Sequence, residues 1–312
     1  YGTAWCRVDA IRRLLVRLGV CVGDTVAVCM PRSVDLVLVC LAVSASGAAY
    51  VPVDLSYPEE RQRFMLGDSG ARVAVCVRGE GDLSSVVSEV GMRAVYVDCV
   101  SVDEAGVCGH DAVLGLSLGG LAAVYCMYTS GSTGRPKGVV VTHGGFANRI
   151  AWMRGALGTS VLGEARVLQN TGPAFDICAW EQMFGLAHGG HVVLLESGLE
   201  RRPDETVRVM RRAGTTIAHF VPSVLGLLAD MAGALASLDA LDWVLHGGEG
   251  ISASLVRRLV EQLPGHVGQW HMYGPTETTI SVTGWRCPGR AADVGEVRVG
   301  RSIPGARAVV VE

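Results

Sequence analysis

The segment with the most groups able to do chemistry reads Y-T-S-G-S-T-G-R-P-K-G and spans residues 128–138. Apolar residues 121–127 precede it and three valines, 139–141, follow it, and runs of this kind are typical of buried strands. The loop between them combines glycines, serines and threonines with Arg135 and Lys137. Backbone N–H groups, hydroxyls and cations bind anions, so the segment is predicted to be a phosphate-binding loop.

This loop differs from the Walker A phosphate loop. In that motif a glycine stands five residues after the first glycine and is followed by Lys and then Ser or Thr. Counted from Gly131, that position is Pro136, and Gly138 follows Lys137. A Ser/Gly-rich hairpin turn on the surface, with no ligand, is the alternative that composition leaves open.

Residues 128–138 resemble the signature loop of the adenylate-forming (AMP-binding) enzymes. This superfamily contains the amino-acid adenylation domains of non-ribosomal peptide synthetases, the acyl-CoA synthetases and the luciferases. The resemblance implies that the loop holds the β- and γ-phosphates of ATP and that Lys137 is catalytic. The implied phosphate contacts are Thr129, Ser130, Gly131, Ser132, Thr133, Gly134 and Lys137.

A second segment with chemical potential, Y-G-P-T-E at residues 273–277, follows the apolar run 267–272. An aromatic face can stack on a purine, a hydroxyl can bond a phosphate oxygen, and Mg²⁺ prefers carboxylate oxygens. A Gly-Pro turn with a solvated acid is the alternative interpretation. The segment matches the adenylate-forming family both in its residues and in its position after the loop at 128–138. This match favours a nucleotide-binding role over a simple turn.

The resemblance assigns roles to this second segment. It implies that Tyr273 flanks the adenine, Thr276 contacts the α-phosphate and Glu277 holds Mg²⁺. ATP and Mg²⁺ are therefore the expected cofactors, and Thr276 and Glu277 join Lys137 as expected catalytic residues. The remaining expected nucleotide contacts are Gly274, Gly248 and Glu249. Gly248 and Glu249 match the family's G-G-E segment, which lies at the edge of the adenine.

Asp176 indicates the class of substrate. It lies among apolar neighbours in F-D-I-C-A-W, residues 175–180, and a carboxylate in such a context is costly unless it is paired. An α-ammonium group is a suitable partner, and the amino-acid-activating branch of the family has Asp at this position of F-D-x-S. Cys178 replaces the Ser here. A helix-capping Asp is the alternative.

The resemblance, carried over position by position, also implies the wall of an amino-acid pocket. Trp180 and Met272 would restrict its volume, whereas His219 and Ser281 would offer polar contacts. This combination fits a small or hydroxyl-bearing side chain, such as that of serine, glycine or a hydroxyphenylglycine. A core histidine with satisfied partners is the alternative for His219. The implied wall is Asp176, Ile177, Trp180, His219, Leu245, Gly247, Met272, Ile280 and Ser281.

The implied reaction is attack of an amino-acid carboxylate on the α-phosphorus of ATP, which gives aminoacyl-AMP and pyrophosphate. Positioning and charge neutralisation carry such a reaction without a covalent enzyme nucleophile. In the family the aminoacyl group then passes to the phosphopantetheine thiol of a carrier-protein domain, among other synthetase domains that make non-ribosomal peptides such as antibiotics. An acyl- or aryl-CoA ligase and a non-catalytic nucleotide-binding scaffold remain alternatives, although Asp176 argues against the ligase.

The elements that must position these residues alternate along the chain. Residues 1–20 have helical spacing of apolar positions, and short apolar runs predict strands at 26–30, 49–53, 73–77, 94–97, 217–221, 241–245 and 267–272. This alternation predicts an α/β fold with doubly wound, mostly parallel sheets and helices on both faces, as in the large N-terminal domain of adenylate-forming enzymes. Ligands bind at the carboxyl ends of such strands.

We expect two α/β subdomains, residues 1–120 and residues 121–312, with the phosphate loop and the amino-acid pocket in the second. By resemblance, Tyr1 falls inside the first core motif of the family. Glu312 stands before the ribose-binding T-G-D motif and the C-terminal lid with its catalytic Lys. The expectation is therefore the N-terminal core portion of an adenylation domain, truncated at both ends, which binds nucleotide weakly and catalyses poorly.

Composition argues against several other classes. Apolar residues make up 49% of the 312 and the net charge is −3, so a large core is available and nucleic acid is not an expected partner. The 10 cysteines include no C-x-x-C pair, so neither zinc nor a disulfide framework is expected. No secretory signal is evident, and residues 36–54 are expected to form a buried helix and strand rather than a membrane span. The expected location is the cytoplasm.

Overall fold

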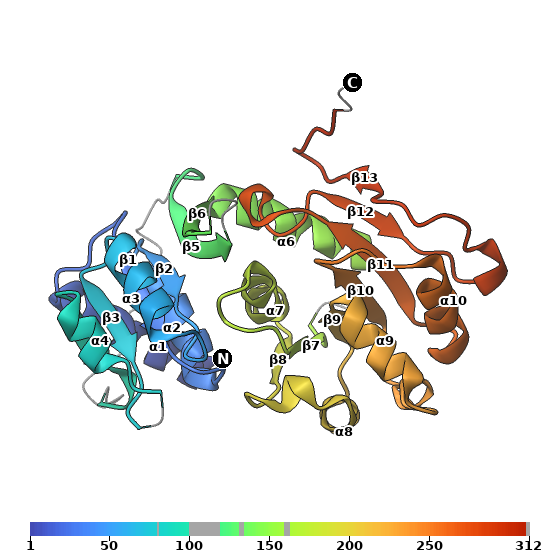
Figure 1. Cartoon of the computed structure of the whole chain (residues 1–312), viewed down its shortest axis with the longest axis horizontal. Helices are drawn as coiled ribbons and strands as arrows, with labels where there is room; N and C mark the ends of the chain where they lie inside the picture. Colours follow the sequence, from blue (N-terminus) through green and yellow to red (C-terminus); the bar gives the residue numbers. More distant parts are fainter. Residues whose placement is uncertain (80, 100–118, 131–133, 159–162, 310–312) are drawn as a thin grey trace. The chain divides into compact units, whose positions relative to one another are not determined.

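The computed structural model describes residues 1–79, 81–99, 119–130, 134–158 and 163–309. The chain forms two compact units (Figure 1). The first contains Tyr1–Phe146 and Gly172–Ala174, and the second contains Ala147–Thr171 and Phe175–Glu312. Each unit is built around one β-sheet.

The first unit has a six-stranded sheet with the order β4-β3-β1-β2-β5-β6. All neighbouring strands are parallel except β5 and β6, which form an antiparallel hairpin. The strands are β1 (Thr25–Cys29), β2 (Ala49–Pro52), β3 (Val73–Cys76), β4 (Arg93–Tyr96), β5 (Ala123–Ser130) and β6 (Pro136–Thr142). The helices are α1 (Gly2–Arg17), α2 (Val34–Ala45), α3 (Glu59–Asp68) and α4 (Ser84–Glu89), and the short 3-10 turn η1 covers Val97–Cys99.

The stretch at residues 36–54, which is uncharged up to Asp54, forms most of α2 and then β2, as the sequence predicted. Ser33 begins the helix, because its hydroxyl accepts the N–H of Leu36 at 3.1 Å. Every residue of β2 is buried. Within the described ranges, no helix has both the length and the apolar character needed to cross a membrane.

The sequence analysis placed the boundary between the units at residue 120. In the structure β5 and β6 lie beyond that residue, yet β5 pairs with β2 through Tyr50 and Tyr125. The rings of these tyrosines lie 5.7 Å apart, and Tyr125 also contacts Phe146 edge to face at 5.9 Å. The β5–β6 hairpin, which carries the predicted phosphate loop, is therefore part of the first unit, because β5 pairs with β2 of that unit's sheet.

The second unit has a seven-stranded sheet with the order β13-β12-β11-β10-β9-β7-β8. The strands are β7 (Arg166–Gln169), β8 (His191–Leu194), β9 (Ile217–Phe220), β10 (Trp243–Gly247), β11 (Gly268–Tyr273), β12 (Thr283–Arg286) and β13 (Arg301–Ser302). The five from β8 to β11 in this order are parallel, and β12 and β13 are antiparallel additions. The helices are α6 (His143–Leu157), of which residues from Ala147 onward belong to this unit, α7 (Asp176–Ala187), α8 (Pro203–Ala213), α9 (Pro222–Asp230) and α10 (Ala253–Gln262).

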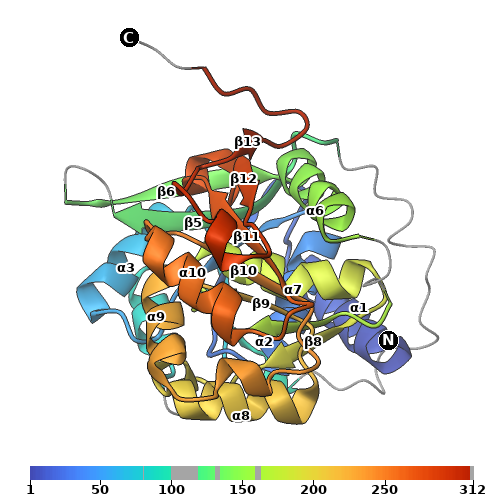
Figure 2. The ribbon, with the colours of Figure 1, turned by 90° about the vertical axis from the view of Figure 1, so that its right-hand side faces the viewer.

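Helices cover both faces of this second sheet. Alternate residues of a strand point to opposite faces. Ala218, Phe220 and Val244 share one buried core with apolar residues of α8, α9 and α10. Figure 2 shows this side, with α10 in the foreground. On the opposite face, α7 packs on β7 so closely that a Cβ on Gly185 would lie 3.2 Å from Val167. The prediction of a doubly wound, mostly parallel α/β fold is confirmed.

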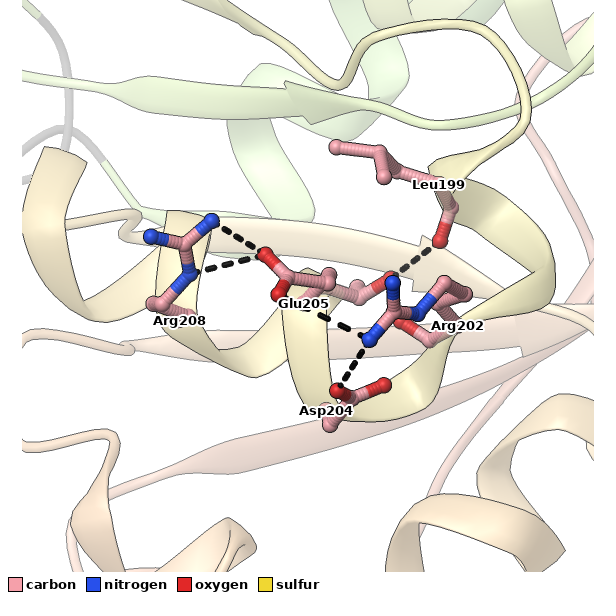
Figure 3. Close-up of polar contacts among 6 residues, drawn as sticks. Leu199, Arg202, Asp204, Glu205 and Arg208 are labelled. Carbon is pink, nitrogen blue, oxygen red and sulfur yellow. Dashed lines mark hydrogen bonds and ion pairs between the residues drawn. The ribbon is translucent and has the colours of Figure 1, made fainter.

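The basic residues near α8 form a solvated face. Arg202 donates to Asp204 at 3.0 Å and lies 3.8 Å from Glu205, which also accepts from Arg208 (Figure 3). Arg202, Asp204 and Arg208 are more than half exposed, and pairs of this kind contribute at most about 1 kcal/mol each. This surface cluster therefore needs no ligand to explain it.

Most cysteines of the described ranges are buried free thiols. Among the described residues, Cys29, Cys40, Cys76, Cys126, Cys178 and Cys287 are buried free thiols, and Cys21 is an exposed one. Cys6, in contrast, is in a disulfide bond, which the spacing of the cysteines did not predict.

Candidate functional site

The predicted phosphate loop is the tip of the β5–β6 hairpin. Thr129 lies opposite Lys137 and Ser130 lies opposite Pro136 in the antiparallel register. Lys137 is exposed, and within the described ranges it forms no ion pair. Gly134 has a φ of 81°, a conformation that glycine adopts without strain. Gly131, Ser132 and Thr133 lie outside the described residues.

The base of this hairpin is fixed by Tyr128. Its hydroxyl donates to Asp68 of α3 at 2.7 Å, and its ring packs edge to face on Phe64 at 6.4 Å. Opposite it, a Cβ on Gly138 would lie 3.0 Å from the sulfur of Cys126. Burial, together with Asp68, raises the pKa of the Tyr128 hydroxyl, so Tyr128 stays a donor. These contacts hold the hairpin in place on the helix.

The G-G-E segment ends β10. Gly247 passes so close to β11 that a Cβ would lie 2.4 Å from the carbonyl oxygen of Met272. Gly248 has a φ of 80° and is exposed. The carboxylate of Glu249 accepts two hydrogen bonds from Ser223, one from the backbone N–H at 3.0 Å and one from the side-chain hydroxyl at 3.1 Å. Glu249 therefore binds the first turn of α9, where a negative charge is also stabilised by the helix dipole.

The Y-G-P-T-E segment follows β11 directly and contains the 3-10 turn η5 (Thr276–Thr278). Tyr273 is 54% exposed, so its ring is available for stacking. Glu277 is exposed, and in the described part of the chain no group of three metal-binding side chains forms. A single carboxylate nevertheless suits Mg²⁺, which is usually held by one or two carboxylates, water and substrate phosphates.

A strained turn follows η5. Thr279 and Ile280 have φ values of 65° and 69°, the left-handed region that β-branched residues avoid. Such a residue costs on the order of 1–3 kcal/mol and persists only where other contacts fix it. Here the N–H of Ile280 donates to the carboxylate of Asp176. The strained turn therefore places a hydrogen-bond donor at Asp176.

Asp176 is the first residue of α7 and is buried, with 9% of its surface exposed. Besides the N–H of Ile280, its carboxylate accepts the hydroxyl of Thr276 and the N–H of Ile177. Burial raises the pKa of Asp176, while these hydrogen bonds and the charge of Arg149 oppose the rise. The structure thus brings together Asp176 and Thr276, which are 100 positions apart in the sequence.

Trp180 and His219 lie in the same region. Trp180 is one helical turn after Asp176 and stacks on Phe184 at 5.2 Å. His219 of β9 pairs in register with Leu245 of β10. Both side chains are at least 97% buried, and the indole N–H of Trp180 and Nε2 of His219 have no hydrogen-bond partner among the described residues. Buried polar groups without partners are unusual in native proteins.

The other expected wall residues fall into two groups. Ile280 and Ser281 follow η5, and Gly274 allows the close approach of this turn, since its Cβ would lie 2.5 Å from Cα of Ser281. Leu245, Gly247 and Met272 lie on the neighbouring strands β10 and β11, where Gly247 pairs with Met272.

Sequence reasoning missed Arg149. This residue of α6 is 1% exposed and its Nε donates to Oγ of Ser281 at 3.1 Å. Its guanidinium lies 5.0 Å from the ring of Trp152 and 5.8 Å from that of Trp180. The signal in the sequence was an arginine among apolar residues of a helix, three positions before a tryptophan.

Sequence reasoning also missed Glu181, which is fully buried in α7. Its carboxylate accepts the N–H groups of Asn170 and Thr171 at 3.2 and 3.0 Å and the Thr171 hydroxyl at 2.7 Å. The Asn170 amide in turn donates to the carbonyl of His219 at 3.1 Å. Glu181 therefore ties the end of β7 to α7 and, through Asn170, to β9.

Cys178 occupies the Ser position of the F-D-x-S pattern. Its sulfur accepts hydrogen bonds from the amides of Gln169 at 3.2 Å and Gln182 at 3.3 Å. A thiol can therefore replace the hydroxyl as an acceptor at this place in α7.

A family model described as "AMP-binding enzyme" matches residues 1–312, the whole chain. The chain belongs to the AMP-binding enzyme family. Phosphinothricin tripeptide synthetase PhsB of Streptomyces viridochromogenes is 38% identical to it over 317 residues, which are 100% of the chain and 25% of that protein. The family resemblance expected from the sequence is confirmed.

Solved structures agree with this membership. The non-ribosomal peptide synthetase FmoA3 matches with a TM-score of 0.80 at 25% identity, over 97% of this chain and 31% of that one. Holo-AB3403, a four-domain non-ribosomal peptide synthetase bound to AMP and glycine, matches with a TM-score of 0.78 at 25% identity, over 96% and 21%. The chain thus spans less than a third of the length of each of these three proteins.

Proposed function

We propose that this chain is the amino-acid-selecting core of an adenylation domain. It would activate an amino acid with ATP as aminoacyl-AMP, with release of pyrophosphate, and so act as an amino-acid adenylating ligase. The observation that carries this proposal is the contact between buried Asp176 and Thr276 of the Y-G-P-T-E segment. An acyl-CoA ligase does not need a buried carboxylate at this position.

The state of Asp176 supports an amino-acid substrate. Burial makes its ionised form costly, and hydrogen bonds from Thr276, Ile177 and Ile280 offset only part of that cost, because its pKa remains raised. An α-ammonium group would supply the opposite charge that a buried carboxylate requires. Thr276, which contacts Asp176, would also contact the α-phosphate, so that the amino-acid carboxylate and the reacting phosphorus meet.

The nucleotide would be held by exposed groups at the ends of strands. The exposed ring of Tyr273 would flank the adenine, with Gly248, Glu249 and Gly274 at its edge. Glu277 would hold Mg²⁺, which neutralises phosphate charge in the reaction. Thr276, Glu277 and Lys137 would be the catalytic residues. The β- and γ-phosphates would bind the β5–β6 loop, through Thr129, Ser130, Gly131, Ser132, Thr133, Gly134 and Lys137.

The amino-acid side chain would be small or would carry a hydroxyl. Trp180 and Met272 limit the volume, whereas Ser281 and the unpartnered Nε2 of His219 offer hydrogen bonds. Serine, glycine and a hydroxyphenylglycine are the candidates. The proposed wall is Asp176, Ile177, Trp180, His219, Leu245, Gly247, Met272, Ile280 and Ser281.

The setting of the reaction follows from the family. We infer that the two compact units correspond to the two subdomains of an adenylation core. The aminoacyl group would pass to the phosphopantetheine thiol of a carrier-protein domain, within a synthetase that makes a non-ribosomal peptide such as an antibiotic. The proposed location is the cytoplasm, with neither nucleic acid nor membrane as a partner.

The test is amino-acid-dependent exchange between ATP and pyrophosphate over a panel of amino acids, fatty acids and aryl acids. It is measured on this chain and on a version extended by the C-terminal segment of the family. Exchange with an amino acid that Asp176→Ala abolishes would support the proposal. Exchange with fatty or aryl acids alone would favour an acyl or aryl ligase. A folded, extended protein without any exchange would favour a scaffold.

A further inference from the structure

A buried cation lies beside the proposed amino-acid site. Arg149 projects from α6 and is held by two kinds of contact, the hydrogen bond from its Nε to Ser281 and the flanking rings of Trp152 and Trp180. Ser281 and Trp180 are both proposed wall residues. The guanidinium therefore lies against two of the proposed wall residues.

The charge of Arg149 lowers the pKa of two further wall residues. It helps to keep Asp176 ionised, and it acts with burial to lower the pKa of His219 to about 3. His219 is therefore neutral at pH 7, while Arg149 and Asp176 carry opposite charges. Arg149 and Asp176 thus supply one positive and one negative charge at the proposed wall before a substrate binds.

This charge balance selects among substrates. The α-ammonium and α-carboxylate of any amino acid add no net charge. A neutral side chain leaves the Arg149 and Asp176 pair balanced, whereas a cationic side chain would place a second positive charge near Arg149, in surroundings where burial makes an uncompensated charge costly. The barrier is electrostatic and does not depend on the size of the side chain.

The hydrogen bond from Arg149 also orients Ser281. Because Oγ of Ser281 accepts from Nε of Arg149, its proton is directed away from the guanidinium and can be donated to a substrate oxygen. The indole N–H of Trp180 can only donate, and it has no partner among the described residues. Two donors are thus offered to an oxygen on the substrate side chain.

We propose that Arg149 determines specificity: it forms a cationic part of the pocket wall that excludes cationic side chains and orients Ser281 toward side chains with a hydrogen-bond acceptor. This inference rests on the proposed function, since it assumes that the pocket binds an amino acid. It adds to the wall a residue from α6 that the sequence did not indicate.

The test measures kcat/KM for amino-acid-dependent exchange at pH 7 with alanine, serine and 2,4-diaminobutyrate. The extended protein is compared with its Arg149→Met and Arg149→Lys variants, and Arg154→Met is the control because Arg154 is an exposed arginine of the same helix. Arg149→Met should raise the use of diaminobutyrate relative to alanine roughly tenfold or more, because the repelling charge is gone. It should lower the preference for serine over alanine by roughly fivefold, because Ser281 is no longer oriented.

Arg149→Lys should keep the discrimination against diaminobutyrate, because the charge remains, and should lose part of the serine preference. Unchanged ratios in a folded Arg149→Met protein would overturn the inference. If tryptophan fluorescence shows that Arg149→Met does not fold, the Arg149→Lys variant becomes the test. Loss of the discrimination against diaminobutyrate in Arg149→Lys would overturn the inference. A wild-type protein that exchanges with no amino acid would contradict the proposed function, and the inference with it.

Discussion

At the scale of single residues, the site is shaped by carboxylates in contrasting environments. Asp176 is buried and accepts hydrogen bonds from Thr276 and from two backbone N–H groups. Glu277 is exposed and is available to a metal ion, whereas Glu249 is engaged with the first turn of α9. The environment of each carboxylate therefore suggests a different role. Asp176 is suited to bind an ammonium group, Glu277 is suited to bind a metal cation, and Glu249 binds the start of a helix.

Binding of the amino acid should depend on the ionisation of Asp176. Because the pKa of Asp176 is raised in the folded protein, its carboxylate is protonated at a higher pH than that of an exposed aspartate, and the protonated form cannot pair with an α-ammonium group. We expect the KM for the amino acid to rise as the solution is made acidic, starting at a higher pH than for an exposed aspartate, with a smaller change in the KM for ATP. Steady-state exchange at a series of pH values measures both constants.

Asp176→Asn should remove this pH dependence and lower kcat/KM for the amino acid by roughly 30-fold or more, since loss of one partner of a buried charge pair costs about 2–5 kcal/mol. A variant that keeps the pH profile of the wild type would show that another group titrates.

Glu277 should set the requirement for Mg²⁺. Replacement of its carboxylate by the amide in Glu277→Gln removes a charged oxygen ligand, so we expect the Mg²⁺ concentration for half-maximal exchange to rise by roughly tenfold. Glu249→Gln is the control, because Glu249 bonds Ser223 instead. Equal shifts in both variants would mean that neither carboxylate binds the metal specifically.

At the scale of elements, the site depends on the close approach of β10 and β11. Gly247 lies opposite Met272, and a Cβ at that position would come within 2.4 Å of a backbone oxygen. A flexible side chain could change its rotamer to relieve such a clash, but the backbone of a central strand cannot move without breaking the pairing of the sheet. The glycine is thus required by packing, whatever its role in ligand binding.

Gly247→Ala should therefore destabilise the second unit by about 1–3 kcal/mol, the cost of overpacking. Urea unfolding followed by tryptophan fluorescence measures it. Gly226→Ala is the matched control: a Cβ on Gly226, inside α9, would meet no atom within 4 Å, so alanine should stabilise by about 0.5–1 kcal/mol. A neutral effect at Gly247 would mean that the two strands separate easily.

At the scale of the whole molecule, the two units have separate sheets and cores, so one unfolding free energy does not describe the chain. The predicted site residues are divided between them: Lys137 belongs to the first unit, and Asp176 and Glu277 belong to the second. Five of the 6 tryptophans, at positions 152, 180, 243, 270 and 285, are in the second unit, so their fluorescence reports mainly on that unit.

The second unit should be sensitive to acid because it buries neutral histidines. Burial lowers the pKa of His219 to about 3, with contributions from Arg149 and His271, and lowers that of His246 to about 3 as well. A lowered pKa of a histidine stabilises the fold above the unfolded value of about 6.5, and this stabilisation is lost as the pH falls toward 3.

From pH 6.5 to 5.0, His219 alone should account for a loss of about 2 kcal/mol in the free energy of unfolding, since each proton bound only by the unfolded state contributes about 1.4 kcal/mol per pH unit. His219→Gln should remove that part of the slope, while His191→Gln, an exposed histidine in β8, should leave it unchanged. Identical slopes for wild type and His219→Gln would show that His219 does not titrate in this way.

The sequence by itself determined the class of fold, the family and the short contiguous segments of the site. Alternating apolar runs and turn residues reveal strands and helices because those depend on nearest neighbours along the chain. The Y-G-P-T-E and G-G-E segments could be placed at strand ends for the same reason, since each directly follows an apolar run. The strand ends then share one edge of a parallel sheet.

Only the tertiary structure decided which of these segments meet and what supports them. Thr276 contacts Asp176 across 100 positions of sequence, and Arg149 reaches Ser281 across 132, distances over which no periodicity carries information. Buried Arg149 and Glu181 looked like ordinary charges, because the sequence does not reveal which helical face is covered. The sequence also did not reveal that the β5–β6 hairpin belongs to the first unit. The pairing between β2 and β5 that places it there depends on how the whole sheet assembles.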